Sequence, residues 1–569
     1  MTAHPLSFEP RITRMPQMKV WRSPSQKNSD PSKSVSSAVK NFFLLSNFYF
    51  VVCFVAFLLC AAVSAQAQNG HGWGKGGKPK SSPTPNPLDP DWTGTSGNWS
   101  DATKWSSGTV PTGQGTTVRL FDNANSGTIT TTQDVSGGVT VGTITLGGST
   151  NQSWTLSLTN KITLDQDGAG TGTATIINSD SAANATRLTI GASAGTGTLT
   201  LADDLAVTNS GSSTSANAIV LNANIDGSGN ITFSNNKNSG TGILLAGNNT
   251  FTGSVFINKG LVNYSSSTAF GNSSNTITLG SSGGGSATLI ATSSTTNLAN
   301  NIIVASGSGG TLTIGSDSTA TSNGATYSGT ITLNDNIRLV GASGGNVVKF
   351  TGVISGSGGI NKDNAGTVQL SGANTYSGTT TISGGTLEAD ATGSNKALGA
   401  SESVVINSSG SLLTTTADQV SHSATMTLAG GTFKTNGTSQ TLGALTLSST
   451  SIIDMGSGTS ILTFANSSAI TWTGTLKIYN WSGTPNTGGG TDQLYFGSTS
   501  SGLTSTQLSN IQFYSDTGTT LFGGGSAIIL SDGEVVPVPE PSTYFAAGVA
   551  SLIVGYTLRK RFVDRRAKA

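Results

Sequence analysis

The sequence predicts an all-β protein whose body is a long parallel β-solenoid. Glycine is abundant, at 76 of 569 residues, and charged residues make up only 10% of the chain. Short alternating runs of Thr, Val, Ile and Leu recur without helical periodicity between about 90 and 535, a pattern typical of strands separated by turns. Strands this short cannot bury a face alone, but stacked coils can share one core. A disordered linker is the alternative, and the regular alternation argues against it.

Residues 1–67 are interpreted as a long basic leader and a signal peptide that forms an N-terminal helix. The apolar run Phe42–Ala65 follows seven basic residues. An Ala-x-Ala pattern places signal cleavage at Ala65 and Ala67. Because the apolar run is long enough to span a bilayer, a retained N-terminal anchor is the alternative, and the true start codon stays open.

Charge and cysteine usage narrow the class of protein. Residues 68–536 carry 15 Lys and Arg against 23 Asp and Glu, so this part of the chain lacks the basic footprint of a nucleic-acid-binding protein. Both cysteines, Cys53 and Cys60, lie in the N-terminal apolar run. A cleaved product would therefore contain no disulfide and no cysteine metal site.

The region after the signal peptide divides into a linker and the solenoid. Residues 68–90 are rich in Gly and Pro, which predicts an extended linker. Residues 91–535 form the predicted solenoid. It begins with three tryptophans, Trp92, Trp99 and Trp105, which either stack on sugar rings or cap the open end of the solenoid. Capping is the favoured interpretation.

An internal repeat supports the solenoid. Leu245–Val262 matches Leu370–Leu387 at a constant offset of 125 residues, and the repeats are clearest at 242–290 and 367–413. They resemble the autotransporter-associated β-strand repeat, which implies a right-handed, pectin-lyase-like parallel β-helix of the passenger type. No C-terminal series of amphipathic barrel strands follows, so self-translocation through a barrel is in doubt.

The last part of the chain, 537–569, combines three features in order. A Val-Pro-Glu-Pro motif precedes an apolar segment over 542–558, and a basic tail follows. The segment is at the short limit for a transmembrane helix, and the positive-inside rule holds the tail in the cytoplasm. The motif consists of Val538, Pro539, Glu540 and Pro541; the basic residues are Arg559, Lys560, Arg561, Arg565 and Arg566.

This arrangement resembles the PEP-CTERM sorting signal of Gram-negative bacteria. The resemblance implies processing by exosortase, a membrane protease, with the Pro-Glu-Pro residues acting in recognition. A plain tail anchor is the alternative, but it leaves the Val-Pro-Glu-Pro motif unexplained.

The body offers no clear catalytic set, so we expect no enzyme, no cofactor and no metal. The acids are scattered except for two pairs, Asp165 with Asp167 and Asp203 with Asp204. Adjacent strand residues point to opposite faces, so Asp203 and Asp204 should diverge. Asp165 and Asp167 could share a face, and solvation at the turn is their simplest role.

The combined interpretation is an exported structural or adhesin-like protein of the cell surface, associated with exopolysaccharide or a biofilm matrix. We expect the Sec translocon, signal peptidase and exosortase as partners, with the C-terminal helix in the inner membrane during sorting and no nucleic acid bound. The final location is the outer surface or matrix of a Gram-negative bacterium. The alternatives are a polysaccharide lyase or hydrolase on a β-helix, and an autotransporter-like passenger. The sequence does not identify the ligand, the oligomeric state or whether the tail is cleaved.

Overall fold

The computed structural model describes residues 90–538 and 541–566, with gaps at 94, 122–126, 149–151, 182–185, 294–295, 317–323, 343–344 and 523–525. The chain divides into two compact units, Met1–Thr84 and Pro85–Ala569. The first unit lies outside the described residues, and so do both predicted cleavage residues, Ala65 and Ala67.

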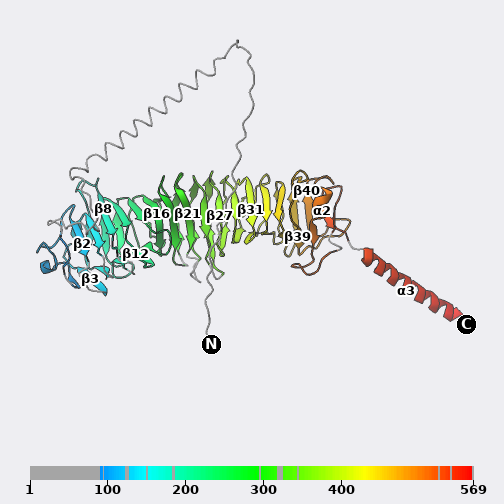
Figure 1. Cartoon of the computed structure of the whole chain (residues 1–569), viewed down its shortest axis with the longest axis horizontal. Coiled ribbons are helices and arrows are strands. Elements are labelled where there is room, and N and C mark those ends of the chain that lie inside the picture. The colour runs from blue at the N-terminus through cyan, green and yellow to red at the C-terminus, as the bar shows by residue number, and fades with distance from the viewer. Residues whose placement is uncertain are drawn as a thin grey trace, which may run out of the picture. The chain divides into compact units, whose positions relative to one another are not determined.

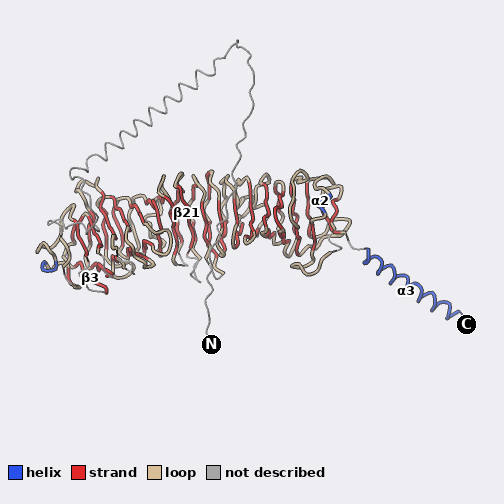
Figure 2. The backbone as a smooth tube through the Cα atoms, in the orientation of Figure 1, coloured by secondary structure: helices blue, strands red, loops and turns tan. Residues whose placement is uncertain are grey.

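Pro85–Ala569 contains a stack of short parallel strands wound into coils (Figures 1 and 2). Most coils contribute one strand to each of three faces. Face 1 contains β2 (Thr117–Phe121), β5 (Thr143–Gly147), β8 (Thr173–Asn178), β11 (Asp204–Asn209), β14 (Ile231–Asn235), the first half of β16 (Val255–Tyr264), β17 (Thr276–Leu279), β20 (Asn301–Val304), β23 (Ile331–Leu333) and β26 (Ile354–Gly356).

Face 2 is the longest ladder. It contains β1 (Gly97–Asn98), β3 (Gly127–Gln133), β6 (Gln152–Leu158), β9 (Leu188–Ile190), β12 (Asn217–Leu221), β15 (Gly242–Leu245), the second half of β16, β18 (Gly285–Ala291), β21 (Gly309–Ser316), β24 (Ile337–Val340), β27 (Ile360–Lys362), β29 (Thr380–Ile382), β31 (Ser403–Asn407), β33 (Thr425–Ala429) and β36 (Leu445–Ser449).

The strands that follow face 2 in each coil form two successive ladders. The first contains β4 (Val139–Val141), β7 (Ile162–Leu164), β10 (Thr198–Leu201) and β13 (Asn224–Gly227). The second contains β19 (Asn297–Leu298), β22 (Thr326–Tyr327), β25 (Val347–Phe350), β28 (Thr367–Leu370), β30 (Gly385–Ala389), β32 (Gly410–Thr414), β34 (Thr432–Lys434), β37 (Ser451–Asp454), β39 (Leu476–Tyr479) and β41 (Ile511–Phe513). A short ladder near the end contains β35 (Gln440–Leu442), β38 (Ser460–Phe464) and β40 (Asp492–Phe496).

All of these ladders are parallel, so the predicted β-solenoid is confirmed. Alternate residues point inward: in β6, four of the seven positions are buried and the three between them are half-buried. The inward side chains join into one core that extends from Trp92 to Val536. Because every coil buries its apolar side only against its own other strands and its neighbours, stacking creates the core that a single coil lacks.

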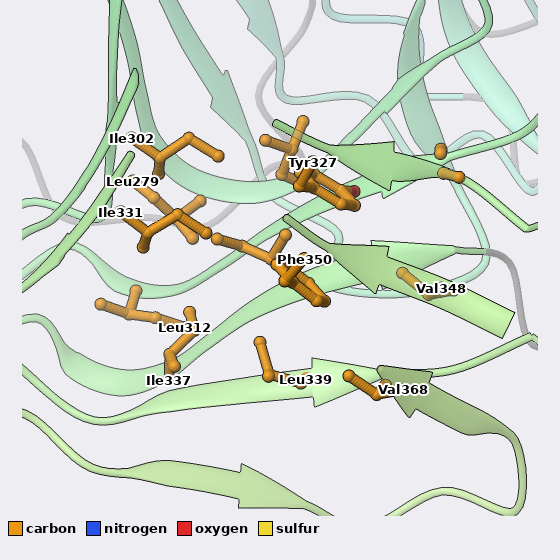
Figure 3. Close-up of a cluster of buried hydrophobic side chains, with 14 of the residues drawn as sticks. Leu279, Ile302, Leu312, Tyr327, Ile331, Ile337, Leu339, Val348, Phe350 and Val368 are labelled. Carbon is orange, nitrogen blue, oxygen red and sulfur yellow. The ribbon is translucent and has the colours of Figure 1, made fainter. Parts of the chain in front are cut away.

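Figure 3 shows how side chains pair across coils in this core. Tyr327 of β22 lies in register with Phe350 of β25, and the two rings stack with centroids 4.8 Å apart. Ile302 of β20 and Ile331 of β23 are likewise in register and buried. Like residues therefore pack on like residues, which suits a sequence assembled from repeats.

Each copy of the internal repeat contains one buried asparagine that makes the same hydrogen bonds in both copies. Asn249 accepts a hydrogen bond from the backbone N–H of Ile225 and donates one to the carbonyl of Ala269. Asn374, which lies 125 residues later, does the same with Ile354 and Ala397. Each buried amide thus connects the coil before it to the coil after it, at a corner outside the strands where backbone hydrogen bonds also join the coils.

A second set of asparagines lines the end of face 1. Asn178, Asn209 and Asn235 occupy the same register position in three successive coils, and none is exposed to solvent. Asn209 Nδ2 donates to Asn235 Oδ1 at 2.8 Å. Asn178 and Asn235 also donate to backbone carbonyls, whereas Asn209 Oδ1 accepts no hydrogen bond within the described residues.

Aromatic residues close the first coils. Trp92 and Trp99 each pack edge-on against Trp105 with centroids 4.9 Å apart, and all three are at most 2% exposed. The short 3-10 helix η1 (Ala102–Lys104) and β1 hold this block against β3. The rings face the core rather than solvent, which supports capping over sugar stacking.

The end of the solenoid differs in topology from the rest. Helix α2 (Ser505–Leu508) precedes β41, and β42 (Ala527–Ile529) pairs with β43 (Val535–Pro537) in an antiparallel ladder. Trp481 packs on Phe513 and Phe522 with centroids 5.1 and 5.2 Å apart. This aromatic group closes the core at the last coils.

Helix α3 (Pro541–Arg566) confirms the predicted C-terminal helix but not its role as a membrane span. Within the described residues, no helix combines the length and apolarity that crossing a membrane requires. The reason lies in its composition, because the 17-residue segment starts with Ser, Thr and Tyr and contains Gly, Tyr and Thr near its end. These residues lower the mean hydropathy of the segment.

Candidate functional site

The predicted sorting motif directly follows β43 in the chain and ends at the first residue of α3. The backbone N–H of Val538 donates to the carbonyl of Ser526 at 3.0 Å, which continues the contact between β43 and β42. Pro539 and Glu540 lie outside the described residues, and Pro541 begins α3. Proline suits this first helical position because its missing N–H would be unpaired there anyway.

The predicted basic residues are in the second half of α3. Arg559, Lys560 and Arg561 are exposed, and Arg565 and Arg566 are the last two residues of the helix. The apolar residues before them are exposed as well, with Leu552 at 73% and Tyr556 at 69%. The helix therefore presents apolar side chains and then positive charge, in that order, without packing them against a core.

The acidic pairs behave differently from each other. Asp203 is 1% exposed, whereas Asp204 is exposed and accepts hydrogen bonds from the backbone N–H and the Nδ2 of Asn230. The predicted divergence of Asp203 and Asp204 is therefore confirmed. Asp165 and Asp167 are brought together with Asp203, their carboxylate oxygens lying within 4.8 Å of one another. Asp165 is only 9% exposed, so the predicted role of solvation at the turn does not fit this side chain.

A hollow of about 490 Å³ lies on the outer side of face 2. Its lining includes Leu261, Asn263, Thr288, Thr313 and Arg338. Leu261, Thr288, Thr313 and Arg338 occupy one register column across β16, β18, β21 and β24. The hollow is thus a shallow surface of hydroxyl, amide and aliphatic groups that runs across several coils.

The charged group in this hollow is already paired. Arg338 Nε donates to both carboxylate oxygens of Asp363, at 2.8 and 2.7 Å. Asp363 lines an adjoining hollow with Asn361. General acid–base catalysis needs ionisable groups that are free to exchange protons with a substrate, and an arginine held by its own carboxylate does not supply one.

One buried cation was not singled out by the sequence. Lys362 at the end of β27 has no solvent exposure, and its Nζ donates to the backbone carbonyls of Asn364 and Gly384. Burial disfavours the charged ammonium and lowers the pKa of Lys362 to about 8, although Asp363 nearby opposes the shift. The lysine connects two coils through carbonyl groups and points away from solvent, so its role is structural.

The sequence alone did not show that Asp165, Asp167 and Asp203 lie close together. The cluster of Asp165, Asp167 and Asp203 depends on the pairing of β7 with β10, in which Leu164 lies opposite Leu201. Spacing along the chain does not reveal that register. A useful signal was present nonetheless: Asp165 follows an Ile-Thr-Leu strand directly, and Asp203 follows a Leu-Thr-Leu strand after one residue.

Two segments of the solenoid match a known family. Residues 237–263 and 360–389 match the family model of the passenger-associated-transport-repeat. They coincide with the repeats that contain Asn249 and Asn374, so these two segments of the solenoid are autotransporter-associated repeats. Repeats of this kind imply an exported, cell-surface protein similar to an autotransporter passenger. No curated protein and no solved structure matches the chain.

Proposed function

We propose that the chain is an exported structural or adhesin-like protein of the cell surface, without an active site of its own. The observation that carries the proposal is the match of two passenger-associated-transport-repeats to the solenoid. The function resides in an extended, hydrogen-bonded surface that contacts exopolysaccharide or neighbouring cells. No nucleic acid is involved, since the solenoid region is mildly acidic.

The architecture supports this role. Strands of one face follow each other through crossovers to parallel neighbours, and such connections are almost always right-handed, so we include a right-handed, pectin-lyase-like coil in the proposal. The outer surface of face 2 displays Thr, Asn and aliphatic groups in register columns. Such groups offer hydrogen bonds and small apolar contacts to an uncharged polymer.

The proposal includes processing at both ends of the chain. Signal peptidase would cut after Ala67 once the Sec translocon has engaged Phe42–Ala65. An exosortase-type membrane protease would recognise the PEP-CTERM-like motif at Pro539, Glu540 and Pro541. The exposed apolar side chains of α3 and the basic residues behind them support a sorting segment, while the helix alone falls short of a membrane span.

Mass spectrometry of the protein from the outer membrane and the culture medium tests this proposal. We expect mature chains that begin after Ala67 and end near Pro541. A matched pair of variants sharpens the experiment: Glu540→Gln removes the motif's charge, and Glu402→Gln removes one exposed charge in the solenoid.

The two variants should differ in the processing of their C-termini. Glu540→Gln should accumulate with an intact C-terminus, and Glu402→Gln should be processed like the wild type. Intact tails in every fraction of the wild type would contradict sorting, and a protein confined to the cytosol would contradict export.

A further inference from the structure

Three carboxylates from two adjacent coils meet at one corner of the solenoid. Asp165 and Asp167 lie in the turn after β7, and Asp203 lies in the turn after β10, the strand paired with β7. One carboxylate oxygen from each lies within 4.8 Å of the other two. Three negative charges this close repel each other strongly, the more so when two of the groups are shielded from water.

The local backbone holds the carboxylates in place. Asp165 Oδ1 accepts the N–H of Gly168 at 2.7 Å, and Asp167 Oδ1 accepts that of Ala169 at 2.9 Å. Asp203 Oδ2 accepts the N–H groups of Gln166 and Asp167, so its carboxylate is fixed directly beneath the turn that carries the other two. These hydrogen bonds orient all three carboxylates without a ligand.

One carboxylate oxygen of Asp203 is left without a partner within the described residues. Asp203 is 1% exposed, and its Oδ1 is buried and accepts no hydrogen bond within the described residues. A buried carboxylate oxygen without a donor is costly unless a cation or a proton reaches it. In the described part of the chain, none of the three aspartates takes part in an ion pair.

The space beside the carboxylates depends on a glycine. A Cβ atom at Gly172 would lie 2.9 Å from Asp203 Oδ2 and 3.1 Å from the carboxyl carbon of Asp167. Any side chain there would press into the cluster. Glycine at this position therefore leaves space next to the carboxylates of Asp203 and Asp167.

We propose that Asp165, Asp167 and Asp203 form a binding site for one calcium ion that connects the coils of β7 and β10. Calcium is a hard cation that prefers carboxylate oxygens and accepts irregular geometry, and water completes its coordination. Because its ligands come from two coils, a bound ion would connect the coil of β7 to the coil of β10. Extracellular calcium sites bind at about 0.1–1 mM, a range that suits a protein outside the cell.

Calcium binding to the purified full-length chain, stripped of metal by a chelator, tests the site. Equilibrium dialysis with calcium should show one more bound ion per chain in the wild type than in Asp203→Asn or Asp167→Asn. The melting temperature of the wild type should rise with added calcium, because the ion binds the folded state, and the rise should be smaller in both variants. Asp167 is exposed, so its variant keeps the test valid if Asp203→Asn does not fold.

Asp204→Asn is the matched control, because it removes a charge from the adjacent residue, whose carboxylate bonds to Asn230 outside the cluster. It should bind as many ions as the wild type. The proposal is overturned if the wild type binds no calcium at about 10 mM, well above the range of extracellular sites. It is equally overturned if magnesium at the same concentration binds and calcium does not, or if Asp204→Asn loses the same ion as the cluster variants.

Discussion

Where the chain turns between faces, single amide side chains add to the backbone hydrogen bonds that join adjacent coils. Asn249 and Asn374 each bond to one coil on either side, through one acceptor and one donor. An asparagine suits this position because its side chain offers both a carbonyl and an N–H₂ group. The two repeats therefore share this residue for a reason of geometry.

Asn249→Ala tests this role. The substitution leaves the N–H of Ile225 and the carbonyl of Ala269 without their buried partner, which should lower the free energy of unfolding by about 1–3 kcal/mol. Asn248→Ala is the control, because Asn248 is exposed and its loss should cost no more than about 0.5 kcal/mol. Chemical denaturation of both variants measures the difference, and equal losses would contradict the role of the amide.

Lys362→Met should change how stability depends on pH. The folded-state pKa of Lys362 is about 8, below the ~10.4 of an unfolded lysine. Between pH 8 and 10 the unfolded chain therefore binds more protons at this residue, and stability rises with pH. Below pH 8 both states are protonated and the contribution is constant.

Denaturation of the wild type and Lys362→Met at several pH values checks this expectation. The stability of the wild type relative to the variant should be flat below pH 8 and increase from pH 8 to 10. A constant difference across the whole range would mean that Lys362 titrates normally in the folded protein.

At the scale of the strand and turn, close approach between coils decides which residues are allowed. A Cβ atom at Gly253 would lie 2.1 Å from the carbonyl oxygen of Gly229, and one at Gly378 would lie 2.4 Å from the carbonyl carbon of Gly358. These two glycines are equivalent in the two repeats. Glycine is required at both positions because the atoms that a Cβ would meet belong to the backbone of the adjacent coil. A backbone in contact cannot move aside as a flexible side chain could.

Gly253→Ala should therefore destabilise the solenoid by about 1–3 kcal/mol, the usual range for overpacking. Thr252→Ala, at the exposed neighbouring position, should change stability by less than about 0.5 kcal/mol. Thermal denaturation followed by circular dichroism compares the two variants. If Gly253→Ala were as stable as Thr252→Ala, the coils would not be in contact at this corner.

At the scale of the whole molecule, a stack of coils has two ends that must be closed. The core is continuous from Trp92 to Val536, so an open end would expose both apolar side chains and unpaired strand backbone. The tryptophans near the start and the aromatic group around Trp481 close the ends of this core.

Trp99→Ala should open the first end. Because Trp99 is fully buried, the substitution should cost about 3–5 kcal/mol and promote association between exposed ends. Trp99→Phe retains an aromatic ring and should lose less stability. Light scattering and denaturation measure the two effects, and a monomeric Trp99→Ala variant of wild-type stability would rule out capping.

Much of this organisation follows from the order of residues alone. The abundance of glycine, the alternation in runs such as Thr380–Ile382 and the 125-residue repeat predict short strands in stacked coils, because period-two alternation has few other folded solutions at this composition. The divergence of Asp203 and Asp204 followed from the same alternation. A C-terminal membrane-spanning helix over 542–558 was predicted as well; the structure has a longer helix, Pro541–Arg566, that is not apolar enough to cross a membrane.

Only the tertiary structure decided which residues meet across coils. Coil lengths vary: Leu164 and Leu201 are 37 residues apart, whereas Leu201 and Gly227 are 26 apart, so no constant spacing places Asp203 beside Asp165. The burial of Lys362 and the inward packing of the tryptophans depend on neighbours in other coils too. Local pattern determines that strands form, whereas register, which arises from the packing of whole coils, determines what each side chain touches.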